Sequence, residues 1–339
     1  MIPTYRRRDL LPDVLRPLLA DPATEELVVV VDGCRDGSLE LLRELADRDA
    51  RVKPMFVENR GRGGAQQAGI DVASKEVVLL LDDDVIAEPD LVTGHARHHA
   101  GGDGLVVLGY MPTVLPKRRL PGQFATFMYA EVYETWCASY RRNPDNILRW
   151  LWGGNVSVRR SDLRRVPLYS PAYTNFYHSD QDFGLRCRKA GLVGVFDPAL
   201  AARHAHSRSL EGFLGDARSQ GAGELRVHQL HHDQLGAVRL EALDPMVKGY
   251  TRAAIRACRR PLAYRGLTMI WRVLLRLAGA LRLFTIETKL ARLLQSVERQ
   301  RGALELLDEQ ARAGHHAQEQ PRGSRPQAAQ ASDSPKSRR

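Results

Sequence analysis

Three consecutive aspartates, Asp82, Asp83 and Asp84, follow the apolar run Val77–Leu81. A continuous apolar run of this length predicts a buried strand, so the carboxylates fall at its carboxyl end, where open α/β sheets bind their ligands. Because side chains alternate along an extended chain, we predict that Asp82 and Asp84 point to one side and Asp83 to the other. Two carboxylates on one side suit a hard divalent cation that takes further oxygens from a diphosphate. The alternative is a solvated acidic turn in which Asp84 or Glu88 caps the helix near Pro89, which is the commoner role of a short acidic run.

Two earlier polar turns also follow predicted strands. Leu27–Val31 is followed by the turn Asp32–Ser38, and Lys53–Val57 by the glycine-rich loop Glu58–Ala65. Helical stretches are predicted between the strands, so residues 1–85 indicate right-handed βαβ units and a parallel sheet. All three turns would then line one edge of that sheet. The polar side chains expected to converge there are Asp32, Asn59, Arg62, Asp82 and Asp84.

The glycine-rich loop is a weak signal by itself. Its glycines do not have the spacing of a dinucleotide or phosphate-loop fingerprint, and no Lys-Ser or Lys-Thr pair follows them. Alone, the loop is equally consistent with a connection that binds nothing.

The amino terminus predicts an incomplete strand. Met1–Thr4 offers only two apolar positions before the turn at Tyr5–Arg7, too few for a central strand. We therefore expect that the first strand is truncated or that its true start lies upstream.

The composition limits the class of protein. The chain has 339 residues, 43% of them hydrophobic, enough for two domains or one large α/β domain with an appendage. Its four cysteines lie far apart, which argues against a disulfide framework or a zinc site and favours a reducing cytoplasm. No signal peptide is recognisable, and no apolar run approaches the roughly 20 residues of a membrane span. The net charge of +10 favours an anionic surface as partner, but no nucleic-acid-binding signature is present, so specific nucleic-acid binding is not expected.

Four short motifs occur in order along the chain: Ile2–Tyr5, Val30–Ser38, Asn59–Ala65 and Leu79–Asp84. In this order they resemble family 2 of the inverting, nucleotide-sugar-dependent glycosyltransferases, which have the GT-A fold. The resemblance covers residues 1–225. It implies an α/β fold with a Rossmann-like, mostly parallel sheet flanked by helices.

The resemblance also implies how a nucleoside diphosphate sugar would be bound. Asp32 and the backbone near Pro3 and Thr4 would hold the base. Asn59 and Arg62 would border the nucleoside.

The same resemblance implies a metal and sugar site. Asp82 would meet the ribose or the sugar, and Asp84 would bind Mg²⁺ or Mn²⁺ together with His204. Gly154 and Asn155, in a Gly-Gly-Asn stretch that resembles a family strand, would lie near the donor sugar and the acceptor. A lone histidine such as His204 is as often a loop or core residue, and this alternative stays open.

The segment Tyr177–Gly191 predicts a helix that ends at Gly191. Its first half resembles the family's Glu-Asp motif, with Ser179 in the place of the Glu. Asp180 holds the position of the family's catalytic base, which an inverting transfer needs to deprotonate the acceptor hydroxyl. The structural alternative is that Asp180 and Asp182 only cap this helix.

Three histidines, His228, His231 and His232, lie close together near the end of the resembling region. No carboxylates are spaced to complete a site with them. We predict a surface position for all three.

The last third of the chain changes character. Ile255–Leu283 and Thr285–Gln300 combine Leu, Ile, Val and Trp with many Arg, as amphipathic helices do. One interpretation is a helical appendage packed on the catalytic domain or on a second subunit of a homodimer. The other is a basic helix on an anionic membrane, which would hold a cytoplasmic enzyme at the inner face of the membrane, near a lipid-linked acceptor. The expected parts are a GT-A domain at 1–240, a helical appendage at 241–310 and a disordered tail at 311–339.

The sequence as a whole predicts a metal-dependent inverting glycosyltransferase. It would move a sugar from a UDP-, GDP- or dTDP-sugar to a hydroxyl of a lipid-linked or polysaccharide acceptor. One alternative is a metal-dependent nucleotidyltransferase, which would need a basic residue near the α-phosphate; Arg6–Arg8 supplies this only weakly. The other is a non-catalytic scaffold that binds a nucleotide sugar, which Ser179 and the short first strand favour.

Overall fold

The computed structural model describes residues 1–170, 177–236 and 249–319. Its first sheet contains three parallel strands in the order β1 (Ile2–Thr4), β2 (Leu27–Asp32) and β3 (Val52–Val57). The helices after these strands are α1 (Leu11–Ala20), α2 (Ser38–Arg48) and α3 (Gly61–Val72). All six residues of β2 are buried, as its continuous apolar run predicts. The parallel βαβ organisation predicted for residues 1–85 is confirmed.

The second sheet is mixed. Its five strands lie in the order β4 (Val77–Leu81), β7 (Asn155–Arg159), β6 (Leu105–Tyr110), β8 (Val193–His204) and β5 (Val85–Ala87). Only the β6–β8 pair is parallel; β4–β7, β6–β7 and β5–β8 are antiparallel. The α/β architecture is therefore as predicted, but parallel pairing dominates only the first sheet.

Strand β1 connects the two sheets. It pairs with β2 on one side, and on the other the backbone nitrogen of Leu81 donates a hydrogen bond of 3.1 Å to the carbonyl oxygen of Met1. Three residues with partners on both sides are thus enough to form a strand here. The carboxyl ends of β1, β2 and β4 consequently lie near one another.

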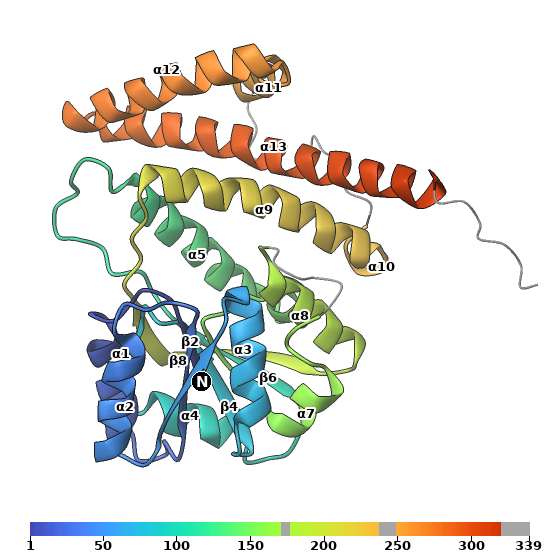
Figure 1. Ribbon diagram of the computed structural model, residues 1–339. Coiled ribbons are helices and arrows are strands. Elements are labelled where there is room, and N and C mark those ends of the chain that lie inside the picture. The colour runs from blue at the N-terminus through green and yellow to red at the C-terminus, as the bar shows by residue number, and fades with distance from the viewer. Residues whose placement is uncertain (171–176, 237–248, 320–339) are drawn as a thin grey trace, which may run out of the picture.

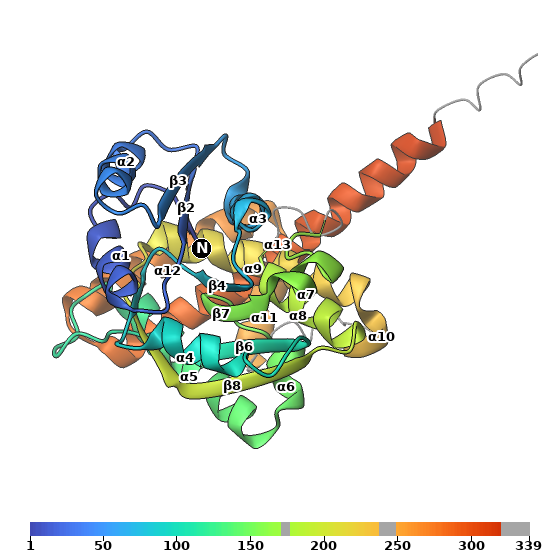
Figure 2. The ribbon, with the colours of Figure 1, turned by 90° about the horizontal axis from the view of Figure 1, so that it is seen from below.

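Helices cover the sheets in layers. Figure 1 shows α5 (Phe124–Arg142), α9 (Leu210–Leu230), α13 (Phe284–Glu319) and α12 (Pro261–Ala280) stacked successively away from the strands. Figure 2 shows the carboxyl-terminal part of α13 projecting beyond the rest of the molecule. The remaining helices are α4 (Leu91–His98), α6 (Asp145–Arg149), α7 (Arg160–Arg165), α8 (Ser179–Lys189), α10 (His232–Leu235) and α11 (Gly249–Ala257).

The carboxyl-terminal helices share a core with helices from the earlier part of the chain. Phe124 of α5, Phe213 of α9, Leu275 of α12 and Leu294 of α13 belong to one buried apolar cluster. The appendage therefore packs on the rest of the chain, as one interpretation of the sequence expects. Helix α13 continues to Glu319, past the predicted start of the tail at 311, and residues 320–339 lie outside the described residues.

The four cysteines, Cys34, Cys137, Cys187 and Cys258, are free and buried. This confirms that they form no disulfide framework. Within the described ranges, no helix combines the length and the apolarity needed to cross a bilayer.

Two glycines bring α9 and α13 into close contact. A Cβ atom at Gly221 would overlap the carbonyl group of Arg299, and one at Gly302 would overlap the carbonyl group of Arg218. Arg218 also pairs with Glu298 of α13 at 2.7 Å. Because the two helix backbones touch at these positions, there is no room for a side chain at 221 or 302 in the seam between α9 and α13.

We expect Gly221→Ala to destabilise the protein by about 1–3 kcal/mol, because the added methyl group would force the two helices apart. Gly215→Ala is the matched control, since it lies in the same helix and nothing lies near its Cβ position. Alanine at 215 should leave stability unchanged or raise it by about 1 kcal/mol through its helix propensity. Urea unfolding of both variants measures the difference, and equal midpoints would contradict the close packing of the seam.

A buried hydrogen-bond chain links α4 to β7. His95 Nδ1 lies 2.8 Å from Ser157 Oγ, and His95 Nε2 lies 2.9 Å from Asn155 Oδ1. His99 Nε2 approaches the same Ser157 hydroxyl at 2.8 Å. Because Asn155 Nδ2 donates to the Leu200 carbonyl, its Oδ1 must accept from His95 Nε2–H. Nδ1 of neutral His95 then accepts from Ser157, so a proton on Nδ1 would break the chain.

Burial lowers the pKa of His95 to about 4, against 6.5 for an unperturbed histidine. A folded-state pKa below the unfolded value means that the unfolded chain takes up the proton first. We therefore expect the free energy of unfolding to fall as the pH drops from about 6.5 to about 4. The buried neutral His95 should account for roughly 3 kcal/mol of this loss. Unfolding free energies at a series of pH values for wild type and His95→Gln measure this contribution. If the unfolding free energies of wild type and His95→Gln changed equally with pH, the proposed contribution of His95 would be contradicted.

Candidate active site

The three aspartates lie in a tight turn. Strand β4 ends at Leu81, and the backbone nitrogen of Val85, the first residue of β5, donates to the Asp82 carbonyl oxygen at 3.2 Å. The predicted alternation of side chains across Asp82–Asp84 is wrong, because the chain turns here instead of remaining extended. Asp82 pairs with Arg62, whereas Asp83 and Asp84 share Arg7. The capping alternative for Asp84 also fails, because the next helix, α4, begins only at Leu91.

Asp84 and His204 face each other in a buried position. Asp84 Oδ1 lies 3.3 Å from His204 Nε2, and both residues are 5% exposed. Their proximity follows from strand pairing, since Val85 lies opposite His204 in the β5–β8 ladder. Burial raises the pKa of the Asp84 carboxyl, but the hydrogen bond from His204 and nearby positive charges outweigh it and hold this pKa below its usual value.

A further cation, Arg7, joins this pair. Its Nη2 lies 3.4 Å from Asp84 Oδ2, and its Nε lies 3.8 Å from Asp83 Oδ1. Asp83 also accepts a hydrogen bond of 3.3 Å from the backbone nitrogen of Tyr5, and burial raises its pKa to about 6. Asp83 thus fixes the loop that carries Arg7. From the sequence, Arg7 is considered only within Arg6–Arg8, as a basic run for a nucleotidyltransferase. Its place directly after β1 was the signal for a position beside the aspartates.

The pair formed by Asp84 and His204 suits a divalent cation completed by other ligands. Two neighbouring ligands of an octahedral Mg²⁺ site, each about 2.1 Å from the metal, lie about 3 Å apart, close to the 3.3 Å observed here. In the part of the chain that the structure describes, no group of three or more His, Cys, Asp or Glu side chains could hold a metal ion. A cation at this place would have Asp84 and His204 as neighbours and would need further ligands, such as water or phosphate oxygens.

Arg62, Asp82 and Asp180 form a second cluster beside the first. Arg62 Nη2 lies 2.7 Å from Asp82 Oδ1, and the charges of Asp82 and Asp180 raise the pKa of Arg62 despite its desolvation. Asp180 Oδ2 accepts a 2.8 Å hydrogen bond from the backbone nitrogen of Gly153. A Cβ at Gly154, where φ is +108°, would lie 2.8 Å from Asp82 Oδ2. Glycine is therefore required for this close approach.

Both oxygens of the Asp180 carboxylate accept hydrogen bonds. Oδ1 accepts from the backbone nitrogen of Gln181 at 3.0 Å, in the first turn of α8, and Oδ2 accepts from the backbone nitrogen of Gly153. Asp180 therefore bonds to the first turn of its own helix, as the structural alternative expects, and also faces Gly153. Asp182 has a structural position, since it is 2% exposed and pairs with Arg186 at 2.9 Å. The second oxygen of Asp182 lies 2.7 Å from Nε2 of His231. The surface position predicted for His231 is wrong, because this residue is buried against α8.

The residues expected to bind the nucleoside lie at the ends of β1, β2 and β3. Pro3 and Thr4 are buried, and Asp32, 5% exposed, accepts a 2.7 Å hydrogen bond from the backbone nitrogen of Arg60. The exposed Asn59 accepts a 3.2 Å hydrogen bond from the backbone nitrogen of Gly61. Their turns meet, since a Cβ at Gly33 would lie 2.7 Å from Asn59 N. The structure brings these residues to one edge, and their roles in binding stay predictions.

Asn155 has a different environment. Its side chain is fully buried, and both of its polar atoms are used by His95 and the Leu200 carbonyl. The structure therefore gives Asn155 partners beneath the edge of the sheet. Its predicted contact with the donor rests on the resemblance alone.

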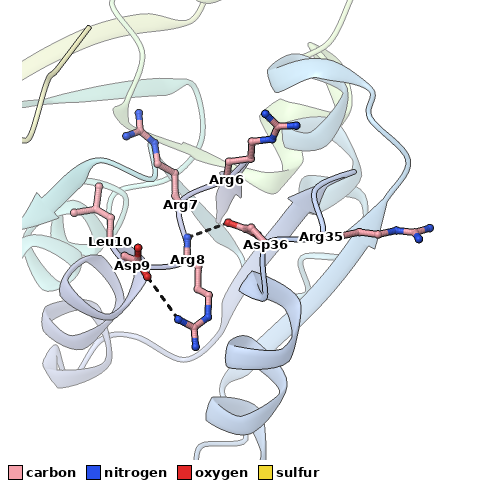
Figure 3. A pocket seen from close by; sticks show the side chains of 7 residues that line it. All are labelled: Arg6, Arg7, Arg8, Asp9, Leu10, Arg35 and Asp36. Atoms are coloured by element: carbon pink, nitrogen blue, oxygen red, sulfur yellow. Dashed lines mark hydrogen bonds and ion pairs between the residues drawn. The ribbon is translucent and has the colours of Figure 1, made fainter. Parts of the chain in front are cut away.

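A basic pocket of about 750 Å³ lies at the turns that follow β1 and β2. It is lined by Arg6, Arg7, Arg8, Asp9, Leu10, Arg35 and Asp36. Figure 3 shows the Arg6 and Arg7 side chains extending to one side of the loop, while the Arg8 side chain points to the other. The backbone nitrogen of Arg8 donates to Asp36 at 3.2 Å, which joins the turns after β1 and β2. The pocket favours an anionic group.

Comparison with known proteins places these motifs in a family. Residues 1–166 match the model for Glycosyl transferase family 2. Over 217 residues the chain is 27% identical to the validoxylamine A glucosyltransferase of Streptomyces hygroscopicus subsp. limoneus, a match that covers 57% of this chain and 48% of that protein. It is 35% identical over 215 residues to the undecaprenyl-phosphate 4-deoxy-4-formamido-L-arabinose transferase of Pseudomonas savastanoi pv. phaseolicola, with coverages of 60% and 54%. The chain spans about half the length of these curated relatives.

The fold has a counterpart among solved structures. The mannosyltransferase PcManGT of Pyrobaculum calidifontis, determined in complex with GDP-Man and Mn²⁺, superposes with a TM-score of 0.57. The alignment covers 91% of this chain and 86% of that chain at 16% sequence identity. This likeness confirms the predicted α/β fold of the GT-A type. The match to the family model shows that residues 1–166 of the chain belong to glycosyltransferase family 2.

Proposed function

We propose that this chain transfers a sugar from a nucleoside diphosphate sugar to a hydroxyl acceptor, with inversion and with a divalent cation. The observation that carries the proposal is the placement of Asp84 and His204 beside Asp82, Arg62 and Asp180 at one edge of the sheet. The family match and the binding of GDP-Man and Mn²⁺ by the structural neighbour support this proposal.

Asp84 and His204 would hold Mg²⁺ or Mn²⁺. When bound, the cation would stabilise the negative charge that develops on the leaving diphosphate. His204 must be neutral to serve as a ligand. Arg7, which contacts Asp84 from the loop after β1, would lie near the same phosphate oxygens.

Asp180 would act as the base. Its carboxylate is partly accessible and is oriented by the backbone nitrogen of Gly153. In an inverting transfer the acceptor oxygen forms a bond to the anomeric carbon as the bond from that carbon to the diphosphate oxygen breaks. The acceptor proton passes to the Asp180 carboxylate, and the nucleoside diphosphate leaves.

The acceptor is proposed at the level of its chemistry, as the hydroxyl of a lipid-linked or polysaccharide molecule. The name of the undecaprenyl-phosphate transferase relative supports a lipid carrier. The name of the poly-β-1,6-N-acetyl-D-glucosamine synthase of Staphylococcus aureus, 26% identical over 133 residues, supports a polysaccharide. The released product distinguishes this function from the nucleotidyltransferase alternative. Sugar transfer releases a nucleoside diphosphate, whereas nucleotidyl transfer releases pyrophosphate.

The metal assignment predicts the behaviour of Asp84→Asn. Mn²⁺ should increase the thermal stabilisation that UDP, GDP or dTDP gives to the wild type, because a cation held by Asp84 would also stabilise the bound diphosphate. Asp84→Asn should weaken this Mn²⁺-dependent effect about 10–100-fold in apparent affinity. Asp83→Asn is the matched control, since Asp83 contacts Tyr5 and Arg7 but not His204. The same loss in both variants would argue against Asp84 as a specific ligand.

The base assignment predicts a separation of binding from turnover. Asp180→Asn should lower the rate of sugar transfer about 10²–10⁴-fold while leaving nucleotide-dependent stabilisation intact, because the amide cannot accept the proton. Asp145→Asn, in the exposed first turn of α6, makes the same change away from the site and should keep full activity. Nucleoside diphosphate release with Mn²⁺ measures both rates. Full activity of Asp180→Asn would refute the assignment.

A further inference from the structure

Helix α12 exposes a continuous apolar face. Leu262, Met269, Ile270, Val273 and Leu277 are between 48% and 83% exposed. Their spacing places them on one side of the helix. Figure 1 shows α12 as the outermost layer of the helical stack. Large apolar side chains gathered in this way are unusual on a protein surface that faces only water.

The opposite side of α12 is already packed. Thr268, Leu275, Ala278 and Gly279 are buried, and Leu275 shares a cluster with Leu294 of α13. The exposed apolar face is therefore additional to the face that holds the helix on the protein. The fold gives no reason for it.

Positive charge borders this face. Residues 249–283 contain eight arginines and no acidic residue. Arg265, Arg272 and Arg276 recur at spacings of seven and four, so they form a stripe along one side of the apolar face. Arg276 also pairs with Glu211 of α9 at 3.1 Å, so Arg265 and Arg272 carry most of the charge offered to phosphate. An apolar face beside long basic side chains suits the boundary between the headgroups and the acyl chains of an anionic bilayer, where arginine reaches up to phosphate. A second copy of this chain would instead bring the same eight positive charges against themselves.

A loop extends the surface toward the candidate active site. Val114, Leu115 and Leu120 are 45–52% exposed. The loop is anchored at both ends: Val114 N donates to the His204 carbonyl oxygen at 2.9 Å, and Arg119 Nη2 lies 2.7 Å from Glu287 Oε2 near the start of α13. A single loop thus runs from the candidate metal ligand to the junction of α12 and α13.

We propose that the outer face of α12, together with the loop 113–122, docks on an anionic lipid bilayer. The helix lies along the surface of the bilayer, with its apolar face inward and its arginines at the phosphates. Because α9 and α13 lie between α12 and the sheets, this docking holds the edge that carries Asp84 and His204 at a fixed distance from the membrane. A membrane-borne acceptor follows if the proposed function also holds.

Vesicle flotation of the full chain tests the docking. Wild type should float with vesicles of phosphatidylcholine and phosphatidylglycerol, and added NaCl should reduce its recovery because salt screens the arginines. The double variant Met269→Glu/Leu277→Glu should lower the floating fraction about tenfold or more, since both changes place a carboxylate in the apolar face. Val72→Glu is the matched control, because Val72 is 51% exposed on α3. It should float like wild type.

Several results would overturn the docking proposal. These are equal flotation of wild type and the double variant, equal flotation of wild type without phosphatidylglycerol, or an equal loss in Val72→Glu. A wild type that sediments as a dimer and does not float, with a monomeric double variant, would assign the face to a second copy. Flotation needs no turnover, so a chain that floats but releases no nucleoside diphosphate would refute the proposed function alone. A chain that transfers sugar but does not float would refute the docking alone.

Discussion

The turn between β4 and β5 is the constraint on which the candidate active site depends. Its hydrogen bond from Val85 to Asp82 reverses the chain immediately after a buried strand. Strand β5 can then pair with β8, which sets Val85 opposite His204 and carries Asp84 to within 3.3 Å of the imidazole. A longer connection would leave the same two side chains free to separate. The geometry of the pair is thus a property of strand register as much as of the residues themselves.

Cations from neighbouring turns make the cluster of carboxylates possible. Three adjacent aspartates repel one another when ionised, and partial burial increases the repulsion. Arg62, from the turn after β3, pairs with Asp82, while Arg7, from the turn after β1, contacts Asp83 and Asp84. An arriving diphosphate would therefore meet guanidinium groups that already lie beside the carboxylates. The parallel order of β1, β2 and β3 supplies these groups, because each of the strands ends at the same edge.

The helical layers connect this edge to the outer surface of the protein. Helix α13 contacts α9 so closely that glycine is needed at 221 and 302, and Glu287 near its start holds Arg119 of the loop that leaves the active site. The apolar face of α12 is consequently not an independent element. It is fixed relative to His204 through one loop and one helix junction, so anything that binds this face is positioned with respect to the candidate metal site.

The sequence by itself determined the buried strands, their parallel order in the first sheet and the edge at which the polar residues gather. Continuous apolar runs such as Leu27–Val31, ended by glycine and aspartate, encode these features locally, and the order of motifs made the family recognisable. Only the tertiary structure decided which polar side chains face the site. Asn155 is bonded to His95, 60 residues earlier, and Asp182 is bonded to His231, 49 residues later. Such partners depend on how distant elements pack, so they cannot be predicted from the residues next to Asn155 or Asp182 in the sequence. The same holds for α12. Its sequence predicts an amphipathic helix, but which of its faces is buried depends on its packing against α13.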